Sequence, residues 1–207
     1  MSQPAVDPNV DQKQRSQNRK VVSALVLLFA APVILAYVAF HMGWFNAASK
    51  NKGTILPSPY PRFEQFQWFD SEGQELHFKN FETRYWWIYF PQTNECDSQC
   101  DINMRLLTQT HAGLGKESEK LTRLVVFPSD IQYVDKVEKP EQLQLAKGNG
   151  QPTQGDGAQL EAGKIYAMDV HGNIFMQYEP VTNEEEAKLR SKDLRTDIRR
   201  VMKTTGL

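Results

Sequence analysis

The chain has 207 residues, and its 24 Lys and Arg side chains nearly balance its 25 Asp and Glu side chains, for a formal net charge of −1. No polybasic block occurs, which argues against a nucleic-acid partner. The most informative features are an apolar segment near the N-terminus and the only two cysteines, Cys96 and Cys100.

The N-terminal part of the sequence predicts a membrane anchor. Residues 1–20 are polar and are expected to form a short disordered tail. Val21–Phe40 contains no charged side chain, and a helix of about 20 residues spans a bilayer's hydrocarbon core. A signal peptide usually has a shorter apolar region and a small-residue cleavage site, and no clean site follows here. A buried soluble helix would have a polar face, which this segment lacks. We therefore expect a transmembrane anchor over residues 21–45 and a linker over 46–62.

The charges that flank the apolar segment predict its orientation. The cations before it are Lys13, Arg15, Arg19 and Lys20, whereas the first cations after it are Lys50 and Lys52. The positive-inside rule therefore places the N-terminus in the cytoplasm and residues 63–207 on the other side. In a bacterium, this arrangement is a single-pass inner-membrane protein with a periplasmic domain. The periplasm is oxidising, so a disulfide between Cys96 and Cys100 would persist there.

The first part of the remaining chain predicts a hairpin followed by a central strand. The aromatic-rich stretch Phe63–Phe69 and the extended stretch Glu75–Phe78 flank a turn signal at Asp70–Gly73. Tyr85–Phe90 is a near-continuous apolar run. A run of this kind is typical of a strand that is buried on both faces.

A helix is predicted directly after the cysteines. Ser98 can cap its N-terminus, and Asp101 three residues later completes a capping-box pattern. Its apolar stripe consists of Ile102, Leu106, Leu107 and Leu114, and its end is marked by Gly113 and Gly115.

The rest of the chain predicts a strand, a loop, a hairpin and a helix. Leu121–Phe127 is a second buried strand. Residues 129–160 are polar, with clustered glycines, and predict a long surface loop with one helical turn near Glu141–Leu145. Lys164–Met168 and Ile174–Tyr178 flank a turn and predict a hairpin. The last helix is expected to begin at Thr182 or Asn183, with the buried stripe Ala187, Leu194, Ile198 and Val201.

The order of these elements predicts the fold class. A βαβ unit followed by ββα is the core order of a thioredoxin-like fold. We therefore expect an α/β, thioredoxin-like domain over residues 63–207, with an extra N-terminal β-hairpin and one preceding transmembrane helix. Cys96 and Cys100 lie between the first core strand and the first core helix, where that fold places its active site.

From Trp86 to Leu207, the chain resembles a divergent member of the Sco/SenC branch of thioredoxin-like proteins. The resemblance is carried by Trp87–Pro91 before the Cys96-x-x-x-Cys100 pair, by Lys164–Asp169 before a glycine-containing turn, and by the basic C-terminal helix. The anchor and the segment Gly43–Pro57 resemble anchored Sco-like proteins associated with cytochrome c oxidase genes in proteobacteria. The resemblance implies a role in oxidase assembly, with oxidase subunits or assembly factors as partners.

The sequence departs from the Sco pattern at two places. Sco proteins usually have proline after the second cysteine, where this chain has Asp101. They also bind copper through the two cysteines and a histidine before the strand that matches Ile165–Met168, and the corresponding loop Gln159–Gly163 contains no histidine. No cofactor is therefore required, and copper, if bound, would be Cu(I) held by Cys96 and Cys100 alone.

The four histidines are expected to lie away from the cysteines or outside any metal site. His111 follows Cys100 by eleven residues, which is roughly 16 Å along a helix. His171 lies in the turn after the Lys164–Met168 strand, roughly 17 Å from the strand's start. His41 lies at the membrane boundary and His77 on the first hairpin.

The cysteine pair leaves three interpretations open. A helix N-terminus stabilises a thiolate, but Glu95, Asp97 and Asp101 oppose this effect, so neither thiol is expected to be strongly acidic. In a thiol–disulfide oxidoreductase, Cys96 would attack a partner disulfide and Cys100 would resolve the mixed disulfide. In a copper metallochaperone, both thiolates would bind the metal. In a non-catalytic interaction module, the disulfide would be structural. No Ser-His-Asp or paired-carboxylate arrangement indicates hydrolysis.

Overall fold

The computed structural model describes residues 8–42, 51–129, 143–155 and 158–205. Its contacts divide the chain into two units, Met1–Lys50 and Asn51–Leu207. Each unit is described by itself.

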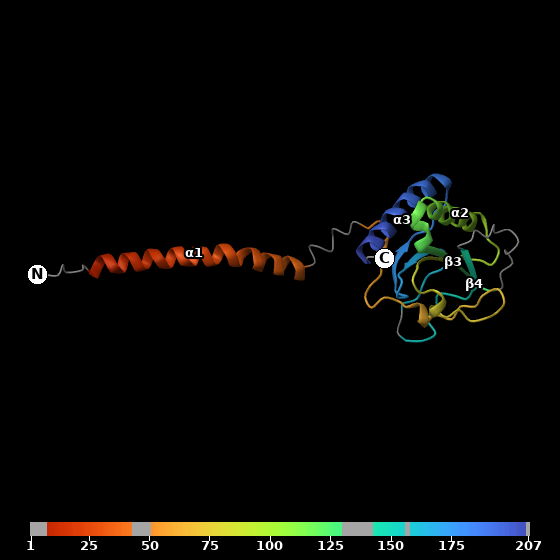
Figure 1. Ribbon diagram of the computed structural model, residues 1–207, viewed down its shortest axis with the longest axis horizontal. Coiled ribbons are helices and arrows are strands. Elements are labelled where there is room, and N and C mark those ends of the chain that lie inside the picture. The colour runs from red at the N-terminus through yellow and green to blue at the C-terminus, as the bar shows by residue number, and fades with distance from the viewer. Residues whose placement is uncertain (1–7, 43–50, 130–142, 156–157, 206–207) are drawn as a thin grey trace, which may run out of the picture. The chain divides into compact units, whose positions relative to one another are not determined.

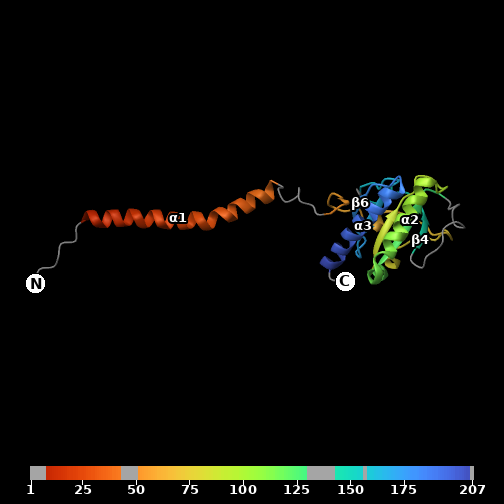
Figure 2. The same cartoon turned by 90° about the horizontal axis from the view of Figure 1, so that it is seen from above.

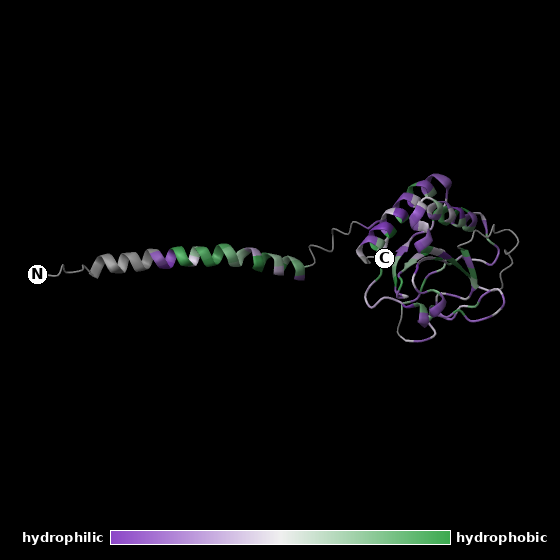
Figure 3. Ribbon diagram, in the orientation of Figure 1, coloured by the Kyte–Doolittle hydropathy of each residue, from purple (hydrophilic) through white to green (hydrophobic). Residues whose placement is uncertain are grey.

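The first unit contains one long helix, α1 (Pro8–His41). Its segment Asn18–His41 is long and apolar enough to cross a membrane, and its most apolar 18-residue window has a mean hydropathy of 2.6 (Figure 3). α1 begins inside the segment that was expected to be a disordered tail, because the Gln, Lys and Arg residues there are good helix formers. Pro32 lies within the helix, which curves in its second half (Figure 2).

The second unit is built on a six-stranded mixed sheet with the order β1-β6-β5-β2-β3-β4. The strands are β1 (Thr54–Ile55), β2 (Tyr85–Tyr89), β3 (Leu121–Phe127), β4 (Leu143–Lys147), β5 (Ile165–Met168) and β6 (Ile174–Tyr178). β2, β3 and β4 are parallel, whereas β5 is antiparallel to β2, β6 to β5, and β1 to β6. The predicted βαβ unit followed by ββα is confirmed.

Two helices cover one face of this sheet (Figure 1). α2 (Ser98–Ala112) connects β2 to β3, and α3 (Glu184–Thr205) follows β6. The side chains of β2 alternate between the two faces: Tyr85, Trp87 and Tyr89 belong to the core under the helices, whereas Trp86 and Ile88 belong to the opposite core. β2 is therefore buried on both faces, as its apolar run predicts.

The opposite face is covered by an irregular aromatic segment and not by the predicted hairpin. The turn at Asp70 forms, and Phe69 and Glu75 make an isolated bridge across it, but no regular strand flanks the turn. The covering residues that are buried are Phe63, Phe66, Trp68, Leu76 and Phe81. Short 3-10 helices at Phe63–Gln65 and Phe78–Asn80 accompany them. Packing these side chains against the sheet buries more apolar surface than an isolated two-stranded ribbon would.

Two further predictions are corrected by strand pairing. A helical turn was expected near Glu141–Leu145. The described part of that stretch, residues 143–145, instead begins β4, which pairs with β3. Residues 130–142 lie outside the described part of the chain. β1 lies within the segment 46–62 that was expected to be a linker, and it pairs with β6. In both cases, long-range pairing overrides local propensity.

Asp197 of α3 fixes the start of the second unit. Its buried carboxylate accepts hydrogen bonds from the backbone N–H groups of Lys52 (2.7 Å) and Gly53 (2.9 Å). The same oxygen accepts from the hydroxyl of Tyr178 at 3.3 Å. Burial, followed by the negative charge of Asp197, raises the pKa of Tyr178, so the hydroxyl remains a donor. This cluster joins the first residues of the unit to β6 and α3.

Candidate functional site

Cys96 and Cys100 form a disulfide at the start of α2, with their Cα atoms 5.1 Å apart. Cys96 lies in the loop after β2 and is half-buried, whereas Cys100 lies in the first turn of α2 and is 3% exposed. The two cysteines therefore differ in burial: Cys96 is partly accessible at the edge of the core, whereas Cys100 lies in the core.

Asp97, and not the predicted Ser98, caps α2. Its Oδ1 accepts a hydrogen bond from the backbone N–H of Cys100 at 2.8 Å, and Ser98 is the first residue of the helix. A carboxylate is as good a cap as a hydroxyl, and Asp97 occupies the position from which it reaches that N–H group. The cap places a negative charge beside the disulfide, and it opposes the stabilisation that the helix N-terminus gives a thiolate. Burial, followed by the charge of Asp97, raises the pKa of Tyr89 on the neighbouring strand.

Asn103, one turn after Cys100, holds α2 in place. Its buried amide donates to the carbonyl of Val181 and accepts from the N–H of Val181, both at 3.0 Å. The same amide donates to the carbonyl of Gln99 at 2.8 Å. One side chain therefore pairs with both the N–H and the carbonyl group of Val181, which lies between β6 and α3. The first turn of α2 is thus held by hydrogen bonds of Asp97 and Asn103 in addition to the disulfide. The sequence argument missed Asn103, although an asparagine inside a helix is an unfavourable choice that invites an explanation.

The loop before β5 lies beside the loop that leads to the cysteines. Gly163 donates its N–H to the carbonyl of Phe90 at 2.6 Å, and Phe90 donates to the carbonyl of Lys164 at 3.3 Å. The ammonium group of Lys164 pairs with Glu161 and Glu179, each at 3.1 Å. Burial lowers the pKa of Lys164, but its hydrogen bonds to the two carboxylates outweigh this effect and raise the pKa overall. This cation is therefore already neutralised and cannot be counted as a thiolate-stabilising charge.

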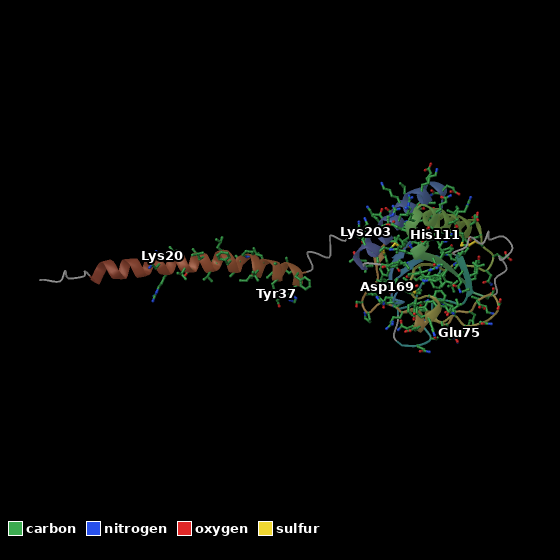
Figure 4. The ribbon with its side chains drawn as sticks, in the orientation of Figure 1. Lys20, Tyr37, Glu75, His111, Asp169 and Lys203 are labelled. Atoms are coloured by element: carbon green, nitrogen blue, oxygen red, sulfur yellow. A yellow bond between two sulfur atoms is a disulfide. The ribbon has the colours of Figure 1, made fainter. Side chains whose placement is uncertain are left out.

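The donor set does not fit a three-ligand copper centre. In the described ranges, no group of three His, Cys, Asp or Glu side chains could hold a metal ion. His111 lies on α2, where its Nε2 is 3.1 Å from the carbonyl oxygen of Ser118 (Figure 4). His171 lies in the β5–β6 turn and donates its backbone N–H to Asp169. The other two histidines are His41, which ends α1, and His77, which precedes a 3-10 helix.

A family model matches most of the second unit of the chain. The family model described as transmembrane-like, thioredoxin-like, C-terminal domain matches residues 86–205. The chain belongs to this family. No curated protein sequence matches it.

Solved structures of Sco proteins share the fold of this family member. Apo Sco1 from Thermus thermophilus is 16% identical, with a TM-score of 0.53 over 75% of this chain and 99% of that one. Yeast Sco1 is also 16% identical, with a TM-score of 0.51 over 72% and 99% of the two chains. A SCO1/SenC family lipoprotein from Bacillus anthracis is 14% identical, with a TM-score of 0.50 over 72% and 96%. At such identities, the likeness shows the fold alone. The predicted thioredoxin-like α/β class is confirmed.

Proposed function

We propose that the protein is a membrane-anchored thiol–disulfide factor whose redox centre is the Cys96–Cys100 pair. The observation that carries this proposal is the set of hydrogen bonds that hold the first turn of α2. Asp97 caps the turn and Asn103 ties it to Val181. Because these hydrogen bonds involve neither sulfur, we expect that the pair can be reduced and reoxidised while the surrounding structure is retained.

The exposure of the two sulfurs supports an assignment of roles. The thiolate of Cys96 attacks a disulfide of the partner, forming a mixed disulfide and releasing one partner thiolate. The thiolate of Cys100 then attacks the sulfur of Cys96, which releases the second partner thiol and leaves the Cys96–Cys100 disulfide. Two electrons pass to the partner, and exchange in the opposite direction follows the same steps in reverse.

The reduction potential tests the redox role. We expect the full chain to have a potential of about −180 to −270 mV, the range of thiol–disulfide exchange proteins, and its circular dichroism spectrum to be the same in both redox states. The disulfide closes a short loop, so its reduction should cost about 2 kcal/mol of stability or less. A potential below about −300 mV, or loss of the fold on reduction, would instead indicate a structural disulfide.

We also propose the predicted topology and domain limits: a cytoplasmic tail over residues 1–20, an anchor over 21–45, and an exported domain. The apolar helix and the transmembrane-like family support a single-pass membrane protein, and the flanking charges support the orientation. A reporter that requires export, fused after Leu207, should be active. Activity of a cytoplasm-only reporter at the same position would contradict the orientation and the periplasmic location.

The partner is proposed from the Sco resemblance: cytochrome c oxidase subunits or assembly factors at the bacterial inner membrane. Deletion of the gene should reduce the amount of assembled oxidase. Because Cys96 and Cys100 have no third ligand in the described residues, added copper should not restore assembly. Full rescue by copper would favour a metallochaperone, and normal oxidase levels would exclude the proposed partner.

A further inference from the structure

Two buried N–H donors that have no acceptor among the described residues belong to neighbouring residues of β2 and β3 beneath α2. Trp87 of β2 and Arg123 of β3 are partners in the parallel register, and they are 0% and 2% exposed. Neighbouring strands lie about 4.8 Å apart, and registered residues of parallel strands point to the same face. Among the described residues, neither Trp87 Nε1 nor Arg123 Nε has a hydrogen-bond partner. Trp87 belongs to the core under the helices, and Arg123 reaches α2.

The hydrogen bond that Arg123 makes is to a neutral group. Its Nη1 donates to the hydroxyl oxygen of Thr108 on α2 at 2.8 Å. That hydroxyl donates its own proton to the carbonyl of Met104 at 2.9 Å, so Thr108 serves the guanidinium only as an acceptor. In the described part of the chain, no ion pair includes Arg123. Burial lowers the pKa of Arg123 to about 10, so the side chain is still positively charged at neutral pH.

A buried guanidinium without a negative partner is unfavourable, because it loses hydration and gains no compensating charge. Buried indole N–H groups are also usually paired. The Nε edge of a guanidinium is half of the planar fork that binds two oxygens of one oxyanion. The chemistry that satisfies both orphan donors is therefore an acceptor with a negative charge and more than one oxygen.

We propose that Arg123 and Trp87 form an oxyanion-binding site between β2, β3 and α2. Its ligand is a carboxylate or an inorganic oxyanion such as phosphate. Arg123 supplies the charge and one N–H group, Trp87 supplies a second N–H group, and Thr108 fixes the guanidinium from the side of α2. This site does not depend on the redox role of the cysteines.

Thermal unfolding of the full chain in detergent micelles tests the site. Phosphate, sulfate and N-acetyl-aspartate amide would each be titrated against chloride at constant ionic strength and pH 7. At least one oxyanion should raise Tm by about 3–5 °C for each tenfold increase above its dissociation constant. Inorganic anions alone indicate a free ligand, whereas the aspartate amide alone indicates a carboxylate side chain of a partner.

Matched variants assign the effect to the two donors. Arg123→Met should abolish the oxyanion dependence of Tm, and Trp87→Phe should weaken the affinity about tenfold, because it removes one donor. Arg84→Met, a change of an exposed arginine, should keep the full dependence. If Arg123→Met does not fold, Arg123→Lys should still show weakened binding, because lysine keeps the charge but not the fork.

Two outcomes overturn the proposal. One is a wild-type Tm that responds equally to oxyanions and chloride. The other concerns the chain's own carboxylates between β3 and β4, which are Asp130, Asp135, Glu138 and Glu141. If oxyanions stabilise only the variant in which these four are replaced by the corresponding amides, an internal carboxylate occupies the site and no external ligand binds there.

Discussion

Asp197→Ala should lower the free energy of unfolding by about 2–4 kcal/mol, because it leaves the buried N–H of Gly53 and the part-buried N–H of Lys52 without an acceptor and removes the ion pair with Arg200. The carboxylate receives two backbone N–H groups, from Lys52 and Gly53, and the hydroxyl of Tyr178. Each buried donor that loses its partner costs about 1–3 kcal/mol. Urea unfolding of the full chain, followed by tryptophan fluorescence, measures the loss.

Two variants separate this effect from a general loss of charge on α3. Asp197→Asn retains one carbonyl oxygen of the same shape and should lose less stability than the alanine variant. Asp193→Ala removes a half-buried carboxylate one turn earlier that has no hydrogen bond of this kind, and it should change the stability by less than about 0.5 kcal/mol. Equal losses of stability in the Asp193 and Asp197 variants would mean that the hydrogen bonds of Asp197 are not the cause.

Cys96→Ser should slow reaction with a disulfide probe about 100-fold or more, because the remaining thiol is buried. Cys100 is 3% exposed, and thiol–disulfide exchange requires that the attacking thiolate reach a sulfur of the probe's disulfide in line. Cys100→Ser keeps the accessible thiol but removes the group that resolves the mixed disulfide. This variant should therefore accumulate a stable adduct at Cys96, which mass spectrometry of the intact protein detects.

The same variants expressed in cells identify the partner. Cys100→Ser should retain covalently bound proteins that a reducing agent releases, and the double serine variant should retain none. Equal probe rates in both single variants would contradict the assignment of Cys96 as the attacking thiol. A stability loss of several kcal/mol in both would instead support a structural disulfide.

The central part of the fold could be predicted because its patterns are local. β2 and β3 are apolar runs that are buried on both faces, and the α3 stripe contains Ala187, Leu194 and Ile198, all buried. The β5–β6 hairpin has a turn signal that the structure confirms, with Gly172 at a φ of 81°. Because Cys96 and Cys100 lie between β2 and α2 in the sequence, their position at the start of α2 could be predicted as well.

The remaining features depend on contacts between distant residues. β1 and β4 exist as strands because they pair with β6 and β3. The clamps made by Asn103 and Asp197 join residues 78 and 144 positions apart, and no short motif encodes such separations. Asp197 did leave a signal, since it is a charged residue at a position that continues the buried stripe of α3. The aromatic cover was missed because a turn between aromatic segments was interpreted as a hairpin.

The Asp197 clamp also constrains the order in which the domain can be completed. Ribosomes release the N-terminus first, so Lys52 and Gly53 are synthesised long before the helix that binds their N–H groups. The N–H groups of Lys52 and Gly53 must therefore remain hydrated until nearly the entire chain has emerged. Closure of the domain is consequently a late, post-translational event. Chains that are interrupted before α3 would carry both cysteines and could still pair β1 with β6, but Lys52 and Gly53 would lack the Asp197 acceptor, and we expect proteases to cut these chains near that segment.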